Sequence, residues 1–175
     1  YGLSPKRLNQ RKTASHNTVE VDGKDSSQVW SGFRVANRAR ILSRFAEQNG
    51  DHNIVLMAAH NGYKSLFGGC IHTRKLLFGD KMLSVVDSLI GSYGRAAARF
   101  YIHPDLETNF VDNLLKIEGR DFVLSCDLNG KKAKLIDSTW NPQFGITRCN
   151  KVLVIDFNIG ELEVNFCWTN KHDVC

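Results

Sequence analysis

Residues 70–90 read CIHTRKLLFGDKMLSVVDSLI, two runs rich in apolar and β-branched residues on either side of a short polar segment. Between the runs, Gly79-Asp80-Lys81 supplies turn chemistry, because glycine and aspartate adopt the backbone conformations that tight turns require. The pattern therefore predicts a β-hairpin whose strands are residues 70–78 and 82–90.

The same kind of pattern continues on both sides of this hairpin. Further strands are predicted at residues 34–45, 53–59, 96–102, 114–117, 121–128, 132–136, 151–157 and 161–168, with turns at 128–131 and 158–161. Many short strands with close-set turns predict an all-β fold, an antiparallel sandwich of two packed sheets that resembles a supersandwich. Only residues 26–30 and 106–112 are predicted to form short helical turns.

Length and composition favour one β-sandwich domain over residues 1–175, because 175 residues with 42% hydrophobic content can bury a core. No apolar run approaches the roughly 18 residues of a membrane helix. The chain starts at Tyr1 and its only methionines are Met57 and Met82, so we expect it to be a piece of a longer protein. Five cysteines without a CxxC pair argue against a disulfide framework or a cysteine zinc site.

The positive charge lies at the front of the chain. Residues 1–50 carry nine Lys and Arg against four Asp and Glu (9 − 4 = +5), and the remainder carries fourteen of each (14 − 14 = 0). A basic N-terminal region favours an anionic ligand such as a phosphate or an acidic polysaccharide, although a solvated cationic surface without a partner has the same composition. Nucleic acid is disfavoured, because no motif of the known nucleic-acid-binding folds is present.

Two histidines follow a common pattern. In residues 16–23, His16 and Asn17 precede an alternating strand in which Val19 and Val21 share one face, and Gly23 closes the run. His60 likewise ends an apolar strand and is followed by Asn and Gly. Side chains at the end of a strand are accessible to a substrate or a metal; the alternative is a turn whose Asn bonds its own backbone.

These residues also carry a resemblance to a known family. The segments 16–19, 21–23, 25–27, 29–30 and 33–35 resemble the opening of the β-sheet domain of the heparinase II/III-like family. The blocks 60–63, 72–74, 86–87 and 103–104 are similar to later blocks of that family, in the expected order. The likeness is strongest from residue 11 to residue 104 and weaker beyond, where little more than Phe144-Gly145 agrees.

The resemblance implies the β-sheet part of a polysaccharide lyase, preceded in the longer protein by an α-helical toroid domain that would be its partner. Such enzymes cleave uronic-acid-containing polysaccharides by β-elimination. A base removes the C5 proton once the neighbouring carboxylate is neutralised, and an acid protonates the departing O4. Histidine, with an ordinary pKa near ~6.5, suits the role of base. The family further implies a bacterial periplasm or cell-envelope location, which the residues themselves do not determine.

The resemblance bears most directly on His16 and His60. In relatives, the corresponding histidines and an intervening Asp hold a zinc ion that is structural, so the expected ligands are His16, His60 and Asp25, with Asp22 as an alternative to Asp25. A catalytic histidine of those relatives stands two residues before the first of these, where this chain has Ala14. His16 is therefore either a metal ligand or itself the catalytic base.

Other residues complete the expected site. Tyr63 is a second candidate base, or a packing residue; Asn17, Arg34 and Arg74 are expected to bind a substrate carboxylate, and Trp30 to stack on a sugar ring. His72, His103, Trp140 and Trp168 are expected to be structural.

Three functions remain open at this stage. The chain is the β-sheet part of a lyase that is inactive without its toroid, a non-catalytic carbohydrate-binding sandwich, or a structural domain in envelope polysaccharide biosynthesis. Ala14 favours the second over the first, if the family's chemistry has been lost here.

Overall fold

The computed structural model describes residues 4–50, 53–65, 69–158 and 160–173. Its elements, in chain order, are α1 (Pro5–Gln10), η1 (Thr13–Ser15), β1 (Val19–Val21), β2 (Gln28–Trp30), β3 (Arg34–Ala36), β4 (Ile41–Asn49), β5 (Asn53–Tyr63), β6 (Cys70–Gly79), β7 (Met82–Ile90), β8 (Ala96–Ile102), β9 (Glu107–Val111), β10 (Leu114–Glu118), β11 (Phe122–Asp127), β12 (Lys132–Trp140), β13 (Arg148–Phe157), β14 (Glu161–Asn170) and η2 (Lys171–Asp173). No helix among these is long and apolar enough to cross a membrane.

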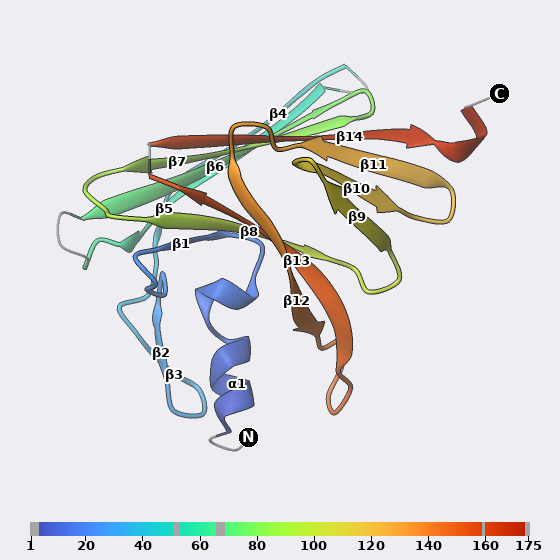
Figure 1. Ribbon diagram of the computed structural model, residues 1–175. Helices are drawn as coiled ribbons and strands as arrows, with labels where there is room; N and C mark the ends of the chain where they lie inside the picture. The colour runs from blue at the N-terminus through green and yellow to red at the C-terminus, as the bar shows by residue number, and fades with distance from the viewer. Residues whose placement is uncertain (1–3, 51–52, 66–68, 159, 174–175) are drawn as a thin grey trace.

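Two antiparallel sheets pack face to face, as the sequence predicted. The large sheet has eight strands in the order β4-β5-β6-β7-β14-β11-β10-β9, and the small one has four, in the order β1-β8-β13-β12. Figure 1 shows the large sheet across the top, the small sheet beneath it, and α1 with the β2–β3 hairpin at the bottom. The predicted hairpin is β6 and β7, with Arg74 opposite Asp87.

The core lies between the two sheets. Alternate residues of β1, β8 and β13 point toward it from the small sheet, and those of β7, β10 and β14 from the large sheet. Val19 and Val21 are fully buried, as their alternation predicted. The opposite face of the small sheet carries a second, smaller cluster in which Ala97, Val152 and Val154 pack with Tyr101. We call this second face the outer face of the small sheet.

Both predicted helical turns are wrong. Residues 28–30 form β2, which pairs with β3, and residues 107–111 form β9, which pairs with β10. In β9, exposed and half-buried side chains alternate, and this period of two belongs to a strand. The helix α1 was not predicted, although Ser4 caps its N-terminus and Pro5 stands at its first position, which are the usual signals of a helix start.

The N-terminal segment crosses the outer face of the small sheet. It contains α1, which buries none of its own residues, and η1, which leads into β1. Side chains of α1 and of Arg11 hold the β2–β3 turn: Arg7 Nε donates to the Gly32 carbonyl at 2.8 Å, and Arg11 Nη1 donates to the Ser31 carbonyl at 3.0 Å. The segment thus lies between the hairpin and the small sheet.

Candidate functional site

A groove of about 880 Å³ lies between the N-terminal segment and the ends of β8, β12 and β13. The N-terminal wall is formed by Lys6, Asn9, Gln10, Ser15, His16 and Asn17. The strand register explains the opposite wall: Tyr101 pairs with Val152 and Ser138 with Asn150, so side chains of all three strands line up on the outer face. Lys6 Nζ donates to Thr147 Oγ1 at 2.5 Å and joins the two walls.

Most of the described residues that line the groove have polar side chains, and none is acidic. Its described lining residues include a lysine, two histidines, a tryptophan and several side-chain amides and hydroxyls, and none of them is Asp or Glu. Amides and hydroxyls are the partners that sugar hydroxyls need, and the Lys6 ammonium in a lining without carboxylates favours a negatively charged ligand. The arrangement can therefore bind an acidic sugar.

The backbone around His16 is held to both sheets. Tyr101 of β8 donates its hydroxyl to the Ala14 carbonyl at 2.6 Å and its N–H to Asn17 Oδ1 at 2.7 Å. From the large sheet, Arg74 Nη1 donates to the Asn17 carbonyl at 2.6 Å. The side chain of His16 is exposed and lines the groove, so its position is fixed by its neighbours while its imidazole faces solvent.

Arg74 is in turn held by a fully buried carboxylate, that of Asp87. Arg74 Nε and Nη2 each donate to Asp87 at 2.7 Å, and His72 Nε2 donates to the same carboxylate at 2.7 Å. Burial alone would raise the pKa of Asp87, but the hydrogen bonds from His72 and Arg74 outweigh it and hold this pKa below its usual range. Asp87 is therefore ionised at neutral pH and connects Arg74 to β6 and β7.

His60 lies at the other end of this network. Gly62 N–H donates to His60 Nδ1 at 3.1 Å, so in the neutral ring Nε2 carries the proton and donates to His72 Nδ1, also at 3.1 Å. Burial, and then the charge of His72, lowers the pKa of His60 to about 4. His60, His72 and Asp87 thus form a hydrogen-bonded chain of two imidazoles and one carboxylate.

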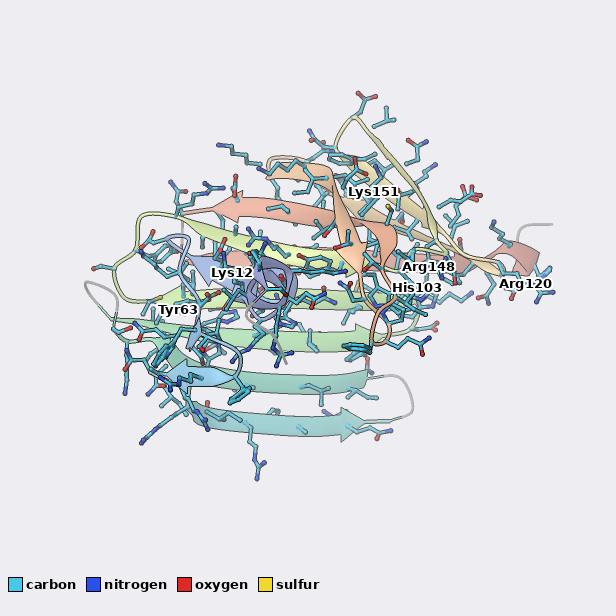
Figure 2. The ribbon with its side chains drawn as sticks, turned by 90° about the horizontal axis from the view of Figure 1, so that it is seen from below. Lys12, Tyr63, His103, Arg120, Arg148 and Lys151 are labelled. Atoms are coloured by element: carbon cyan, nitrogen blue, oxygen red, sulfur yellow. The ribbon has the colours of Figure 1, made fainter. Side chains whose placement is uncertain are left out.

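Asp25 and Tyr63 each form a hydrogen bond with a backbone group of the N-terminal segment or of β1. Asp25 Oδ1 accepts the Thr13 N–H at 2.6 Å, at the start of η1. Tyr63 is fully buried, and its hydroxyl donates to the Val19 carbonyl at 2.5 Å. Burial raises the pKa of Tyr63 well above its ordinary value. In Figure 2, Tyr63 and His103 of the groove lie on opposite sides of the molecule. A catalytic role for Tyr63 stays a prediction.

Trp30 and Arg34 pair with each other on the β2–β3 hairpin. The Arg34 guanidinium lies 4.8 Å from the centre of the Trp30 ring, and 49% of Trp30 is exposed. Neither lines the groove, so the structure places them on a separate surface. Of the expected substrate-binding residues, Asn17 lines the groove. Arg74 does not line it but donates a hydrogen bond to the Asn17 carbonyl.

The expected zinc ligands are not assembled as a ligand set in the described part of the chain. No group of three or more His, Cys, Asp and Glu side chains there is placed to hold a metal ion. Both ring nitrogens of His60 have partners, and Asp25 accepts a backbone hydrogen bond. These residues do not fit a zinc ion in this arrangement, and zinc binding by His16, His60 and Asp25 stays a prediction.

Sequence reasoning assigned only His16 and Asn17 of the groove residues to the site, and it missed His103, Trp140 and Asn150 among others. His103 and Trp140 were expected to be structural, but both line the groove, with ring centres 4.6 Å apart. The sequence held a weak signal for His103, because this residue belongs to one of the blocks that resemble the family. Trp140 and Asn150 depend on the pairing of β12 with β13, which no local pattern shows.

Comparison with solved structures shows the fold, a β-sandwich similar to part of heparan sulfate lyase HepC and of a heparinase III. Heparan sulfate lyase HepC from Pedobacter heparinus has a TM-score of 0.70 and 19% identity, over 97% of this chain and 27% of that one. A HepC mutant has a TM-score of 0.67 with 19% identity, over 91% of this chain and 25% of that one. The heparinase III BT4657 gene product has a TM-score of 0.67 with 14% identity, over 97% and 26%.

A family model gives the particular assignment. The model described as "Heparinase II/III-like, C-terminal" matches residues 1–168, and the chain belongs to that family. No curated protein matches the chain. The chain spans about a quarter of the length of the solved structures to which it is similar.

Proposed function

We propose that this chain is the β-sandwich part of a polysaccharide lyase that cleaves uronic-acid-containing polysaccharides by β-elimination. The observation that carries the proposal is the presentation of His16: an exposed imidazole on a fixed backbone, in a groove whose described lining has no carboxylate. Family membership and the likeness to lyase structures support the same reading.

In the proposed chemistry, an imidazole removes the proton, and groove residues neutralise the negative charge of the uronate carboxylate. A base removes the proton at C5 of the uronate, the electron pair forms the C4–C5 double bond, and the C4–O4 bond breaks. An acid then protonates O4 of the departing sugar. His16 Nδ1 or Nε2 is the candidate base on this chain, and Asn17 and Lys6, which also line the groove, are the candidates to neutralise the ring carboxylate.

Arg74 has a positioning role in this proposal. Its guanidinium is occupied by Asp87 and by the Asn17 carbonyl, so it holds the residue next to His16 and does not face the groove as a free cation. The remaining catalytic groups, including a residue of the toroid domain that neutralises the uronate carboxylate, would come from the longer protein.

A second candidate function is non-catalytic carbohydrate binding. Ala14 stands where relatives carry a catalytic histidine, and its carbonyl accepts the Tyr101 hydroxyl, so this position serves the fold here. A structural role in envelope polysaccharide biosynthesis would need neither the polar lining nor the exposed imidazole.

The experiment is calorimetric titration of the purified chain with an unsulfated glucuronate-containing hexasaccharide, beside its His16→Ala and His172→Ala variants. We expect binding to the parent chain, a loss of about fivefold or more for His16→Ala, and no change for His172→Ala, because His172 is exposed on η2 outside the groove. Absence of binding to the parent chain would contradict the proposal.

The same samples separate catalysis from binding. We expect the chain alone to release no unsaturated uronate, measured by ultraviolet absorbance, because the base and the remaining groups are divided between domains. Turnover by the chain alone would overturn that division. Metal analysis of the parent chain, with His16→Ala and His60→Ala beside it, tests the zinc prediction; a parent chain purified without zinc would remove it.

A further inference from the structure

We propose that the end of the groove formed by β8, β12 and β13 is a subsite for one acidic pyranose ring, built by His103, Trp140 and Asn150. The proposal deepens the proposed function and rests on it, since it names residues that would hold the sugar next to the one at His16. It concerns binding only and assigns no proton transfer to these residues.

Trp140 and His103 form the aromatic side of this subsite. Their rings make a T-shaped contact, with centres 4.6 Å apart and an interplanar angle of 62°. Trp140 is the last residue of β12, an edge strand, and its half-buried indole lines the groove. An indole at the edge of a polar groove is suited to the apolar face of a pyranose ring, because its flat surface contacts the C–H groups.

The ring of His103 is oriented by its own turn. Asp105 N–H donates to His103 Nδ1 at 3.3 Å, so in the neutral ring the proton is on Nε2. The Asp105 carboxylate forms an ion pair with Arg148 and lies 3.6 Å from the same Nδ1. Both contacts occupy the Nδ1 side of the ring, and Nε2–H is left to donate to a ligand oxygen. Figure 2 shows His103 and Arg148 close together at this end of the molecule.

Asn150 supplies an independent observation that points to a ligand. Its side chain is 93% buried (7% exposed), and Nδ2 donates to the Ile102 carbonyl at 3.0 Å. Its Oδ1 has no hydrogen-bond partner among the described residues, although Asn150 lines the groove. A buried acceptor without a donor is destabilising, so a hydroxyl that becomes its donor is favoured; because Oδ1 has almost no exposed surface, the groove wall must open slightly for that hydroxyl to reach it. A sugar hydroxyl is such a donor.

The charge of the surroundings selects an acidic ring over a neutral one. The described lining residues have no carboxylate, the groove carries Lys6 on the facing wall, and the Asp105 carboxylate beside His103 is paired with Arg148. A ring carboxylate placed here would accept from His103 Nε2–H, on the side of the ring away from the Asp105 carboxylate. The Trp140 indole, the His103 Nε2–H donor and the Asn150 Oδ1 acceptor together match the C–H face, the carboxylate and a hydroxyl of a uronate ring.

The test is calorimetric titration with the glucuronate hexasaccharide and with its carboxyl-reduced, neutral form. The variants are Trp140→Phe and His103→Gln, with Trp168→Phe and His172→Gln as matched controls on β14 and η2, outside the groove. We expect each groove variant to weaken hexasaccharide binding about fivefold, and each control to leave it unchanged. The neutral form is expected to bind about tenfold more weakly than the acidic one, and to lose less on His103→Gln. Unchanged circular dichroism spectra of the variants show that they remain folded.

The outcomes separate this proposal from the proposed function. If the parent chain and its His16→Ala variant behave as expected but Trp140→Phe and His103→Gln bind normally, the subsite is overturned and the proposed function stands. If the neutral and acidic oligosaccharides bind equally, the assignment to an acidic ring fails. If the parent chain binds no hexasaccharide, both proposals fail together.

Discussion

At the scale of single residues, Asp87 connects the interior of the large sheet to the site. Its carboxylate is fully buried and accepts three hydrogen bonds, two from Arg74 and one from His72. Arg74 then reaches the Asn17 carbonyl, next to His16. A buried carboxylate with two cationic or polar partners is stable only as a complete set, because each partner satisfies charge that the interior would otherwise leave uncompensated.

We expect Asp87→Asn to lower the free energy of unfolding by about 3 kcal/mol, because it leaves the Arg74 guanidinium without its counter-ion in a half-buried place. Urea denaturation measures the change. The matched control is Asp137→Asn, which removes the partner of Lys151 in an exposed ion pair and should cost under about 1 kcal/mol. If the two variants lower the free energy of unfolding equally, the buried carboxylate of Asp87 stabilises the fold no more than an exposed one.

His60 makes the stability of the molecule depend on pH. Its folded pKa, about 4, lies below the ordinary value of 6.5, so the unfolded chain binds the proton more readily. The stabilisation from keeping this ring neutral is complete above pH 6.5 and is lost as the pH falls toward about 4. With allowance for partial exposure, we expect a loss of roughly 2 kcal/mol over that window.

Chemical denaturation at several pH values checks this expectation. His60→Gln keeps an acceptor for Gly62 N–H and a donor for His72, and should flatten the pH profile between pH 6.5 and about 4. His172→Gln, at an exposed site, should leave the profile as it is. An unaltered slope in His60→Gln would contradict the assignment.

At the scale of elements, prediction from sequence succeeded where alternation and burial coincide. The bounds of β7 and β8 match the predicted 82–90 and 96–102, because both strands turn regular apolar faces into the core. β2 and β9 were missed, because β2 has three residues, mostly exposed, and β9 is an edge strand that mixes polar and apolar side chains. Their pairing is set by neighbours distant in sequence.

The groove shows the same division between local and distant signals. His16 and Asn17 were identified because they precede a regular strand. Trp140 was not, because β12 continues past residue 136 through Asp137, Ser138 and Thr139, a polar stretch that its pairing with β13 alone makes a strand. Asn150 becomes part of the site by that same register.

The β2–β3 hairpin depends on Arg11 for its position. Arg11 Nη1 donates to the carbonyls of Ser31 and Gly32, and Nη2 donates to that of Arg34 at 3.2 Å. We expect Arg11→Gln to raise amide hydrogen exchange across residues 28–36 by about tenfold, without lowering global stability by more than about 1 kcal/mol. Exchange measured by mass spectrometry checks this, with Arg38→Gln, an exposed arginine after β3, as the control. Protection that persists in Arg11→Gln would show that the hairpin is held by other contacts.

At the scale of the whole molecule, the charge of the chain and the position of the groove agree. The net charge is +5, and all of the excess lies in residues 1–50, which include the N-terminal wall of the groove. The eight-stranded sheet carries the Asp87 network, and the four-stranded sheet presents its outer face to the groove. Of the nine Lys and Arg residues in this region, Lys6 lines the groove, so its charge faces the place where an acidic chain would bind.

This arrangement predicts that binding of the glucuronate hexasaccharide depends on salt. Mobile ions screen exposed charges over about 10 Å at 0.1 M ionic strength, and the facing wall acts on the ligand across such distances. We expect the dissociation constant to rise about threefold or more between low and physiological ionic strength, and that of the carboxyl-reduced form to stay nearly constant.

Lys6→Gln should reduce the salt dependence, because Lys6 lies in the groove. Lys116→Gln, an exposed lysine on β10 outside the groove, serves as the control. A hexasaccharide affinity that does not change with salt would mean that the ligand is held by stacking and neutral hydrogen bonds, and that the basic N-terminal region serves some other purpose.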